Sequence, residues 1–296
     1  MTALLKKIRH LVEAGFVWIA FIFFHYLLPF SASVALGGWI GRKAGPHLPR
    51  SNRARSNLKK CFPELTPVEI ERIVIDMWDN YGRLAAEYAN PDGFWDGETL
   101  RNIEVTGIEN LKHFQEDGKP GIIFTAHTGN WQMITLAAQS IGFDLTQMYR
   151  PANNPWVDQL MLRCQKLAVK NVITKSKKGP KDLLSLLRRG DHALLLVDQK
   201  MGEGISVPFL GRNAMTAKGV ARMYLNQNCP LLPARSERLH DSHFRVTFYP
   251  PIEFTPRGDH QQDMYRLLLK INTMIGEWVI ERPCQWLWVH RRWIDS

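Results

Sequence analysis

The chain has 296 residues, of which 38 are Lys or Arg and 28 are Asp or Glu, giving a formal net charge of +10. This length suits one large domain, and no linker or repeat divides it. Its four widely spaced cysteines form no Cys-x-x-Cys pair, which argues against a disulfide framework or a zinc site. No nucleic-acid-binding motif accompanies the charge, so we expect an anionic membrane surface, a phosphorylated lipid or an acidic carrier protein as partner.

Residues 16–30 form the most apolar window, and extension back to residue 11 brings the stretch close to the length that crosses a bilayer. Basic residues flank this window on both sides, and Glu13 is the only acidic residue among the first sixty. Three interpretations stay open: a spanning helix, a helix lying in the interface, or a signal peptide cleaved after residues 31–33. We favour a membrane anchor over residues 1–40 and a body over residues 41–296 on the cytoplasmic face of the inner membrane.

The remaining elements alternate along the chain. Capping signals at Thr66 and Pro67 begin a helix at residues 66–88. Strands are predicted at 103–105, 121–126, 143–149, 171–174, 192–197, 230–236 and 244–249, the last two as antiparallel neighbours. Helices are predicted at 108–116, 133–138, 156–168, 183–189, 220–227 and 265–280, and a loop at 207–219. This alternation predicts the α/β class, with a mixed sheet flanked by helices.

The segment from His127 to Gln132 follows a buried strand and precedes a helix. Gly129 permits a tight turn there, and Asn130 is available as a helix cap. Substrates of α/β proteins usually bind at the ends of strands, so His127 is the first candidate for catalysis. A glutamine five residues later, in the first helical turn, is predicted to reach one imidazole nitrogen and orient the ring. The alternative is a loop histidine beside a cap.

The ordered motifs resemble those of the bacterial late acyltransferases of lipid A synthesis, within the lysophospholipid acyltransferase superfamily. The central match is His-x-Gly-Asn-Trp at residues 127–131, which is similar to the family's HX4(D/E) motif. Further matches lie at residues 55–58, 62–64, 149–151, 154–155, 197–199, 207–211 and 283–293. The resemblance covers about residues 5 to 294. It implies a glycerolipid acyltransferase-like fold and an acyltransferase that needs neither metal nor cofactor.

The resemblance also implies roles for individual residues. His127 is expected as general base, Gln132 as its orienter and Arg163 as a stabiliser of the oxyanion. Asn130, Arg150, Asp198 and Gln199 are expected on the substrate side, and strand-end Asp198 is also the best substitute for a carboxylate missing at residue 132. The donor would be an acyl carrier protein thioester or acyl-CoA, and the acceptor a hydroxyl of a lipid A precursor or related glycolipid. In relatives, the region at residues 207–219 lines the acyl tunnel.

Gln132 departs from the family pattern, which has a carboxylate there. A neutral amide accepts a hydrogen bond but does not balance the charge of an imidazolium, and the analogous change in a catalytic triad costs roughly 10^4 in turnover. Three explanations remain open: an engineered Glu→Gln change that traps a substrate complex, a natural variant with a replacement carboxylate, and a degraded enzyme. We favour the first. The alternatives to lipid A acylation are an inactive lipid-binding paralogue and an acyltransferase for another membrane lipid, such as a phosphatidylinositol mannoside.

Overall fold

The computed structural model describes residues 3–90, 101–169, 171–174 and 178–293. Its longer helices are α1 (Ala3–Tyr26), α2 (Phe30–Ala44), α3 (Ser51–Cys61), α4 (Pro67–Ala89), α7 (Ile108–Glu116), α8 (Gln132–Gln139), α9 (Pro155–Ala168), α10 (Gly179–Arg188), α11 (Gly219–Gln227) and α12 (His260–Glu281). The strands are β1 (Ile103–Thr106), β2 (Gly121–Thr125), β3 (Thr146–Tyr149), β4 (Asn171–Thr174), β5 (His192–Leu196), β6 (Lys200–Phe209), β7 (Arg212–Thr216), β8 (Leu231–His240) and β9 (His243–Phe248). The predicted α/β class is confirmed.

Seven strands form one mixed sheet in the order β1-β9-β8-β2-β5-β3-β4. The five strands from β8 to β4 are parallel to one another. β9 pairs antiparallel with β8, as predicted, and β1 runs parallel to β9. All carboxyl ends of the parallel group therefore meet at one edge, which is where α/β proteins usually bind their ligands.

The central strand β2 is buried on both faces, so its side chains alternate between two hydrophobic layers. Ile122 and Phe124 point into a layer that includes α12 and the tryptophans near the C-terminus. Ile123 points into the opposite layer, formed with α7 and α8. Trp286 and Trp288 belong to the first of these layers and are fully buried. Helices and apolar side chains thus cover both faces of the sheet. The polar strand ends are the positions of the sheet that remain available to a ligand.

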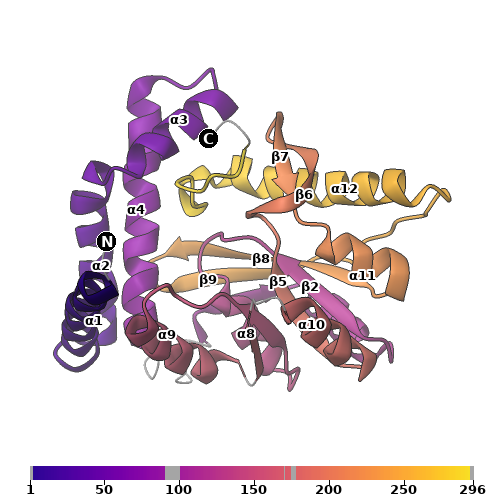
Figure 1. Cartoon of the computed structure of the whole chain (residues 1–296), viewed down its shortest axis with the longest axis horizontal. Coiled ribbons are helices and arrows are strands. Elements are labelled where there is room, and N and C mark those ends of the chain that lie inside the picture. Colours follow the sequence, from indigo (N-terminus) through magenta and orange to yellow (C-terminus); the bar gives the residue numbers. More distant parts are fainter. Residues whose placement is uncertain (1–2, 91–100, 170, 175–177, 294–296) are drawn as a thin grey trace.

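Helix α4 stands beside the sheet, with α1 and α2 on its outer side (Figure 1). Its start is fixed by a capping box, in which Thr66 and Glu69 bond reciprocally, as the residues Thr66-Pro67 indicated. α2 packs closely on α4 because both helices carry glycine at the contact. A Cβ at Gly37 would overlap the backbone of Gly82, and one at Gly41 would overlap the backbone of Trp78. At these glycines the two helices therefore touch backbone to backbone.

Two details differ from the sequence-based expectations. The loop predicted at residues 207–219 is the second half of an antiparallel pair, β6 with β7, followed by α11. The alternation of apolar and polar residues that indicates a strand is hidden there, because Pro208, Gly211 and a turn interrupt it. The N-terminal apolar segment is split at Pro29, where α1 has ended and α2 begins. The expected boundary at residue 40 falls inside α2, while α1, over Leu5–Tyr26, is the one helix among the described residues that is long and apolar enough to cross a membrane.

We expect Gly82→Ala to lower the free energy of unfolding by about 1–3 kcal/mol, because the new methyl group overlaps the backbone of α2. Gly219→Ala is the matched control. Gly219 begins α11 and has open space around its Cα, so alanine there should be neutral or stabilising by up to about 1 kcal/mol. Thermal denaturation of the two variants in detergent measures the difference. Equal stability would show that the glycine contact is not tight.

Candidate active site

Neighbouring strands bring His127 and Asp198 together. β2 and β5 are parallel and in register, with Thr125 opposite Leu196. His127 lies two residues after Thr125, and Asp198 lies two residues after Leu196. The two side chains therefore leave the sheet at matching positions. The predicted placement of a histidine between a strand and a helix is confirmed, since α8 begins at Gln132.

The Asp198 carboxylate holds His127 at two points. Its Oδ1 lies 2.7 Å from His127 Nδ1, and its Oδ2 accepts the His127 backbone N–H at 3.0 Å. The indole N–H of Trp286 donates to the same Oδ2 at 2.8 Å. Burial alone would raise the pKa of Asp198, but the charge of His127 and these donated hydrogen bonds hold that pKa well below its usual range. The carboxylate of Asp198 is therefore ionised. Nδ1 of His127 carries a hydrogen and donates it in a hydrogen bond to this carboxylate.

The predicted contact between Gln132 and His127 is wrong. Gln132 is the first residue of α8 and is 2% exposed, but its amide lies against Tyr88 and makes no hydrogen bond to the imidazole. Its backbone N–H donates to Asn130 Oδ1 at 3.1 Å. The side chain that contacts the imidazole is Asp198, which was expected on the substrate side or as the substitute for a carboxylate missing at residue 132. Five residues of separation did not decide where the side chain points, because α8 turns residue 132 into the core.

The other nitrogen of His127 faces a small polar cluster. Gln199 Nε2 lies 3.1 Å from His127 Nε2 and 3.0 Å from His290 Nε2. Because Nδ1 of His127 donates its N–H to Asp198, Nε2 is the acceptor nitrogen whenever the ring carries one proton, and it then receives one N–H of the Gln199 amide. Burial, followed by the positive charges of His127, Arg150 and Arg50, lowers the pKa of His290 to about 4. His290 is thus a neutral imidazole and accepts the second N–H.

Two aromatic side chains fix the position of His127. The Tyr81 hydroxyl donates to the His127 carbonyl at 2.9 Å, and burial raises its pKa so that it stays protonated. The Trp131 ring meets the imidazole edge-on, with 4.8 Å between centroids. Trp131 closed the His-x-Gly-Asn-Trp match, whereas Tyr81 and His290 were not singled out from the sequence. Only the closing motif at residues 283–293, which contains His290, gave a signal that this segment returns to the site.

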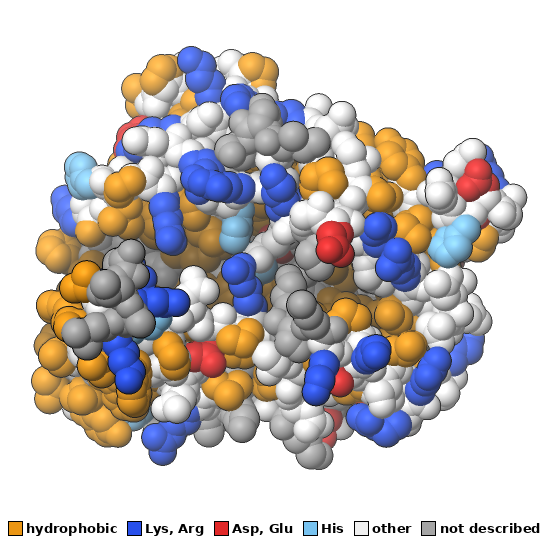
Figure 2. All heavy atoms as spheres, in the orientation of Figure 1, with side chains coloured by type: hydrophobic (Ala, Val, Ile, Leu, Met, Phe, Trp, Pro, Cys, Tyr) orange, Lys and Arg blue, Asp and Glu red, His pale blue; other side chains and the backbone are white. Residues whose placement is uncertain are grey.

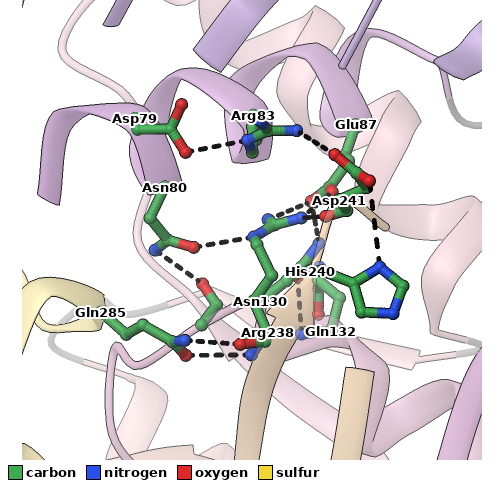
Figure 3. A network of polar contacts seen from close by, with 11 residues as sticks. Asp79, Asn80, Arg83, Glu87, Asn130, Gln132, Arg238, His240, Asp241 and Gln285 are labelled. Atoms are coloured by element: carbon green, nitrogen blue, oxygen red, sulfur yellow. Dashed lines mark hydrogen bonds and ion pairs between the residues drawn. The ribbon is translucent and has the colours of Figure 1, made fainter. Parts of the chain in front are cut away.

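A second polar network holds the turn after His127 (Figure 3). Glu87 and Arg238 are 1% and 6% exposed and form a bidentate pair, with Arg238 Nη2 to Glu87 Oε2 at 2.9 Å. Asn130 Nδ2 donates to the same Glu87 oxygen at 2.9 Å, and Asn80 Oδ1 accepts from Arg238 Nε at 2.9 Å. Asn130, expected on the substrate side, is fully buried and serves this network instead.

Gln285 links this network to the C-terminal segment. Its side-chain amide exchanges two hydrogen bonds with the backbone of Arg238, at 2.9 and 2.6 Å. Its backbone carbonyl accepts from Gly129 N at 3.2 Å. Gly129 has φ +54, and a Cβ there would press on the backbone of Ser236, so glycine is required. The turn at residues 127–130 is therefore clamped from α4, β8 and the C-terminus.

The two predicted arginines lie outside the cluster. Arg150 is exposed after β3, near enough to His290 to influence its charge. Arg163 is exposed on α9, a helix that contributes no hydrogen bond to His127 among the described residues. Figure 2 shows Lys and Arg side chains spread over this face, with few acidic ones among them. Within the described ranges, no group of three or more His, Cys, Asp or Glu side chains is arranged to hold a metal ion.

A large apolar cavity adjoins the site. It has a volume of about 670 Å³ and is lined by α1, α2, α4, α9 and Trp131. Tyr81 and Trp131 line it, and both also contact His127, which is not itself among the lining residues. None of its lining residues comes from residues 207–219, the region that the resemblance associated with an acyl tunnel. Its size falls in the usual range of ligand pockets, roughly 300–1,000 Å³.

We expect Glu87→Ala to destabilise the protein by about 3–5 kcal/mol, because it leaves the buried Arg238 guanidinium without its carboxylate. The matched control is Glu104→Ala. Glu104 pairs with Arg245 on the surface, at 2.8 Å with the carboxylate 58% exposed, so its loss should cost less than about 1 kcal/mol. Chemical denaturation gives both values. A cost below about 1 kcal/mol for Glu87→Ala would contradict the importance of the buried pair.

The depressed pKa of His290 makes a pH-dependent contribution to stability. The unfolded chain binds this proton near pH 6.5 and the folded chain only near pH 4, so stability should fall as pH falls from about 6.5 to about 4. The loss is on the order of 2–3 kcal/mol. His290→Asn removes this contribution, while buried His192, whose pKa is also lowered, titrates in both proteins. Melting temperatures from pH 7 to 4.5 should therefore fall less steeply in the variant, and parallel curves would refute the assignment.

Comparison with known proteins identifies the family of this chain. Residues 1–295 match the family model described as bacterial lipid A biosynthesis acyltransferase. The chain is 27% identical over 273 residues to the lipid A biosynthesis palmitoleoyltransferase of Escherichia coli (strain K12), covering 90% of this chain and 86% of that protein. It is 24% identical to the E. coli lipid A biosynthesis lauroyltransferase, with the same coverage, and 24% identical to a lipid A biosynthesis acyltransferase of Haemophilus influenzae, covering 92% and 86%. The chain belongs to the bacterial lipid A biosynthesis acyltransferase family.

Proposed function

We propose that this protein transfers a fatty acyl group from a thioester donor, acyl carrier protein or acyl-CoA, to a hydroxyl of a lipid A precursor or related glycolipid. One observation carries the proposal. An ionised, buried Asp198 holds Nδ1 of His127, so that Nε2, on the side of Gln199, is the basic nitrogen of the ring. That is the arrangement of a general base and its orienting carboxylate.

His127 and Asp198 account for the proton that moves during the reaction. Nε2 of His127 takes the proton of the acceptor hydroxyl as its oxygen attacks the thioester carbonyl. Asp198 stabilises the imidazolium that forms, because it lies 2.7 Å from Nδ1 in a buried setting. When the carbon–sulfur bond breaks, the thiolate takes the proton back from Nε2. The products are the acylated lipid and a free thiol, and His127 returns to its neutral state.

This arrangement removes the argument against activity that Gln132 raised. The carboxylate that the reaction needs reaches His127 from the end of β5, so an amide at residue 132 leaves no charge unbalanced. Of the three explanations for Gln132, the geometry favours a natural variant with a replacement carboxylate. The inactive paralogue loses its only support.

Gln199 marks the position that the acceptor hydroxyl takes. Its amide occupies Nε2 of His127 and shares its second N–H with His290. A substrate hydroxyl must displace that amide to be deprotonated, and Gln199 is then free to bind the acceptor. Exposed Arg150, beyond His290, is available to a phosphate on the acceptor or donor.

The same proposal includes a membrane setting. α1 is apolar along Leu5–Tyr26, and basic residues predominate around it. Anionic lipid on the cytoplasmic face of the inner membrane would attract those charges. An anchored enzyme would meet its lipid acceptor at the bilayer surface, and a soluble thioester donor would approach from the cytoplasm.

We expect His127→Ala and Asp198→Asn to remain folded and to lose transfer by about 10^2- to 10^4-fold. The assay follows a radiolabelled acyl group from an acyl carrier protein thioester to a lipid A precursor in detergent. His113→Ala, an exposed histidine on α7, is the control and should keep full activity. Full activity of Asp198→Asn in a protein of normal stability would eliminate the proposed pair.

The effect of Gln132→Glu separates the two possible orienters. With Asp198 already on Nδ1, a carboxylate at the buried position 132 gains no contact with His127 and is desolvated beside Tyr88. Activity should stay within about threefold of the parent or fall, and stability should decrease as pH rises. A gain of about 10^2-fold or more would instead make residue 132 the working partner.

A further inference from the structure

We propose that Gln199 is a catalytic residue whose side-chain N–H binds the oxyanion formed during acyl transfer, and that His290 is the positioning residue that aims this N–H. The inference rests on the proposed acyl transfer for the identity of the reacting group. It names the side chains that would stabilise the charge developing on the thioester carbonyl. It also gives His290, which the sequence did not single out, a part in the reaction.

Three side chains meet in one polar cluster at the carboxyl edge of the sheet. Gln199 Nε2 lies 3.1 Å from His127 Nε2 and 3.0 Å from His290 Nε2. The two imidazole rings are 5.8 Å apart between centroids. All three residues are half-buried, so a substrate can reach them from the surface. One amide nitrogen thus bridges the base of the reaction and a second histidine.

The contacts permit one orientation of the Gln199 amide. His127 donates from Nδ1 to Asp198, so its Nε2 is an acceptor whenever the ring carries one proton, and the atom facing it must be a donor. The same amide nitrogen faces His290, which can accept because burial, together with neighbouring positive charges, lowers its pKa to about 4. An NH2 group has one hydrogen for each ring, whereas a carbonyl oxygen would face two acceptors. The amide nitrogen therefore points toward both imidazoles.

The position of His290 is set by helix α3. Asn57, which is 1% exposed, donates from Nδ2 to the carbonyl oxygens of Trp288 at 2.9 Å and His290 at 3.1 Å. Arg53 Nη1 donates to the carbonyl of Val289 between them, at 3.1 Å. Three successive carbonyls are thus tied to one helix. An imidazole held in this way is a fixed anchor for the amide that donates to it.

The second N–H of Gln199 is the one that the reaction would use. The acceptor oxygen takes its place beside Nε2 of His127 and bonds to the thioester carbon, the proton passes to Nε2, and an electron pair of the C=O bond moves onto the carbonyl oxygen. This oxyanion sits on the carbon that the acceptor oxygen has attacked, within reach of the displaced N–H, while the first N–H stays on His290. The electron pair re-forms the carbonyl as the carbon–sulfur bond breaks, and the thiolate takes the proton from Nε2. A donor aimed where charge develops lowers the barrier because its bond strengthens in the transition state.

Gln199 fits this role better than Arg163, to which the resemblance gave it. Arg163 is exposed on α9, a helix that contributes no hydrogen bond to His127 among the described residues. Gln199 directly follows Asp198 after the end of β5, so the residue that orients the base and the residue that binds the oxyanion are neighbours in the chain. Because the amide is neutral, it forms no ion pair with Asp198, and its N–H remains available.

We expect Gln199→Ala in the full-length protein to lower kcat by about 10^2- to 10^3-fold with little change in KM, because the oxyanion contact exists only in the transition state. His290→Leu should lower kcat by about 10- to 10^2-fold, because the amide loses its anchor. His290→Gln offers an amide oxygen as acceptor and should recover most of that loss. Gln262→Ala, at an exposed position of α12, is the matched control and should keep the kcat of the parent.

The double variant tests whether His290 acts through Gln199. In the Gln199→Ala background, His290→Leu should cost less than about twofold in kcat, because the amide that it positions is already absent. If the two losses multiply, or if His290→Gln is no better than His290→Leu at an unchanged melting temperature, the role of His290 is structural and the positioning is overturned. A kcat of Gln199→Ala within about threefold of the parent overturns the oxyanion contact.

Binding of a tetrahedral anion gives a readout independent of transfer. The probes are the monomethyl ester of dodecylphosphonic acid, whose head is a tetrahedral anion like the intermediate, and the neutral carboxylic methyl ester of the same chain. The parent should prefer the phosphonate, and Gln199→Ala should lose about tenfold of that preference. If the parent transfers nothing but shows this preference and its loss, the anion-binding role of Gln199 stands and the proposed function fails. If the parent transfers acyl groups and Gln199→Ala changes neither transfer nor preference, the proposed function stands and the role of Gln199 fails.

Discussion

A buried carboxylate at the end of β5 determines how the site is built. Asp198 is 1% exposed, and an ionised group in that position is tolerated only when donors surround it. It receives two from His127 and one from Trp286. These three hydrogen bonds join β2, β5 and the C-terminal segment, so the charge that orients the histidine also holds together the elements that carry it.

The second buried carboxylate, Glu87, stabilises the same turn from the opposite side. Asp198 fixes the imidazole of His127, while Glu87, through Asn130 and Arg238, fixes the backbone that follows. A polar network of this kind is favourable only when every member is paired, and it then permits a single arrangement. The His-x-Gly-Asn sequence therefore combines two features: a histidine that is held by Asp198, and a glycine and an asparagine that set the shape of the turn.

The fold was largely predictable because the buried strands read as continuous apolar runs and the helices carry clear caps. Thr66-Pro67 fixed the start of α4, and the run before His127 fixed β2. The hairpin of β6 and β7 was missed because its residues are mixed and broken by Pro208 and Gly211. The pattern of a single strand carries little information about which strand lies next to it. Asp198 was therefore recognisable as a strand-end carboxylate, but its pairing with His127 became visible only once β5 was placed beside β2.

The predicted contact between Gln132 and His127 was wrong for a physical reason. Spacing along the chain limits which side chains can meet, but the rotation of α8 decides which do, and it turns residue 132 toward Tyr88. His290 was missed for the converse reason, since 163 residues of chain separate it from His127 and only tertiary folding brings it to Gln199. The carboxylate that meets His127 thus comes from the end of the neighbouring strand β5 and not from the helix that follows the histidine. Residue 132 instead packs in the core next to Tyr88, a lining residue of the apolar cavity.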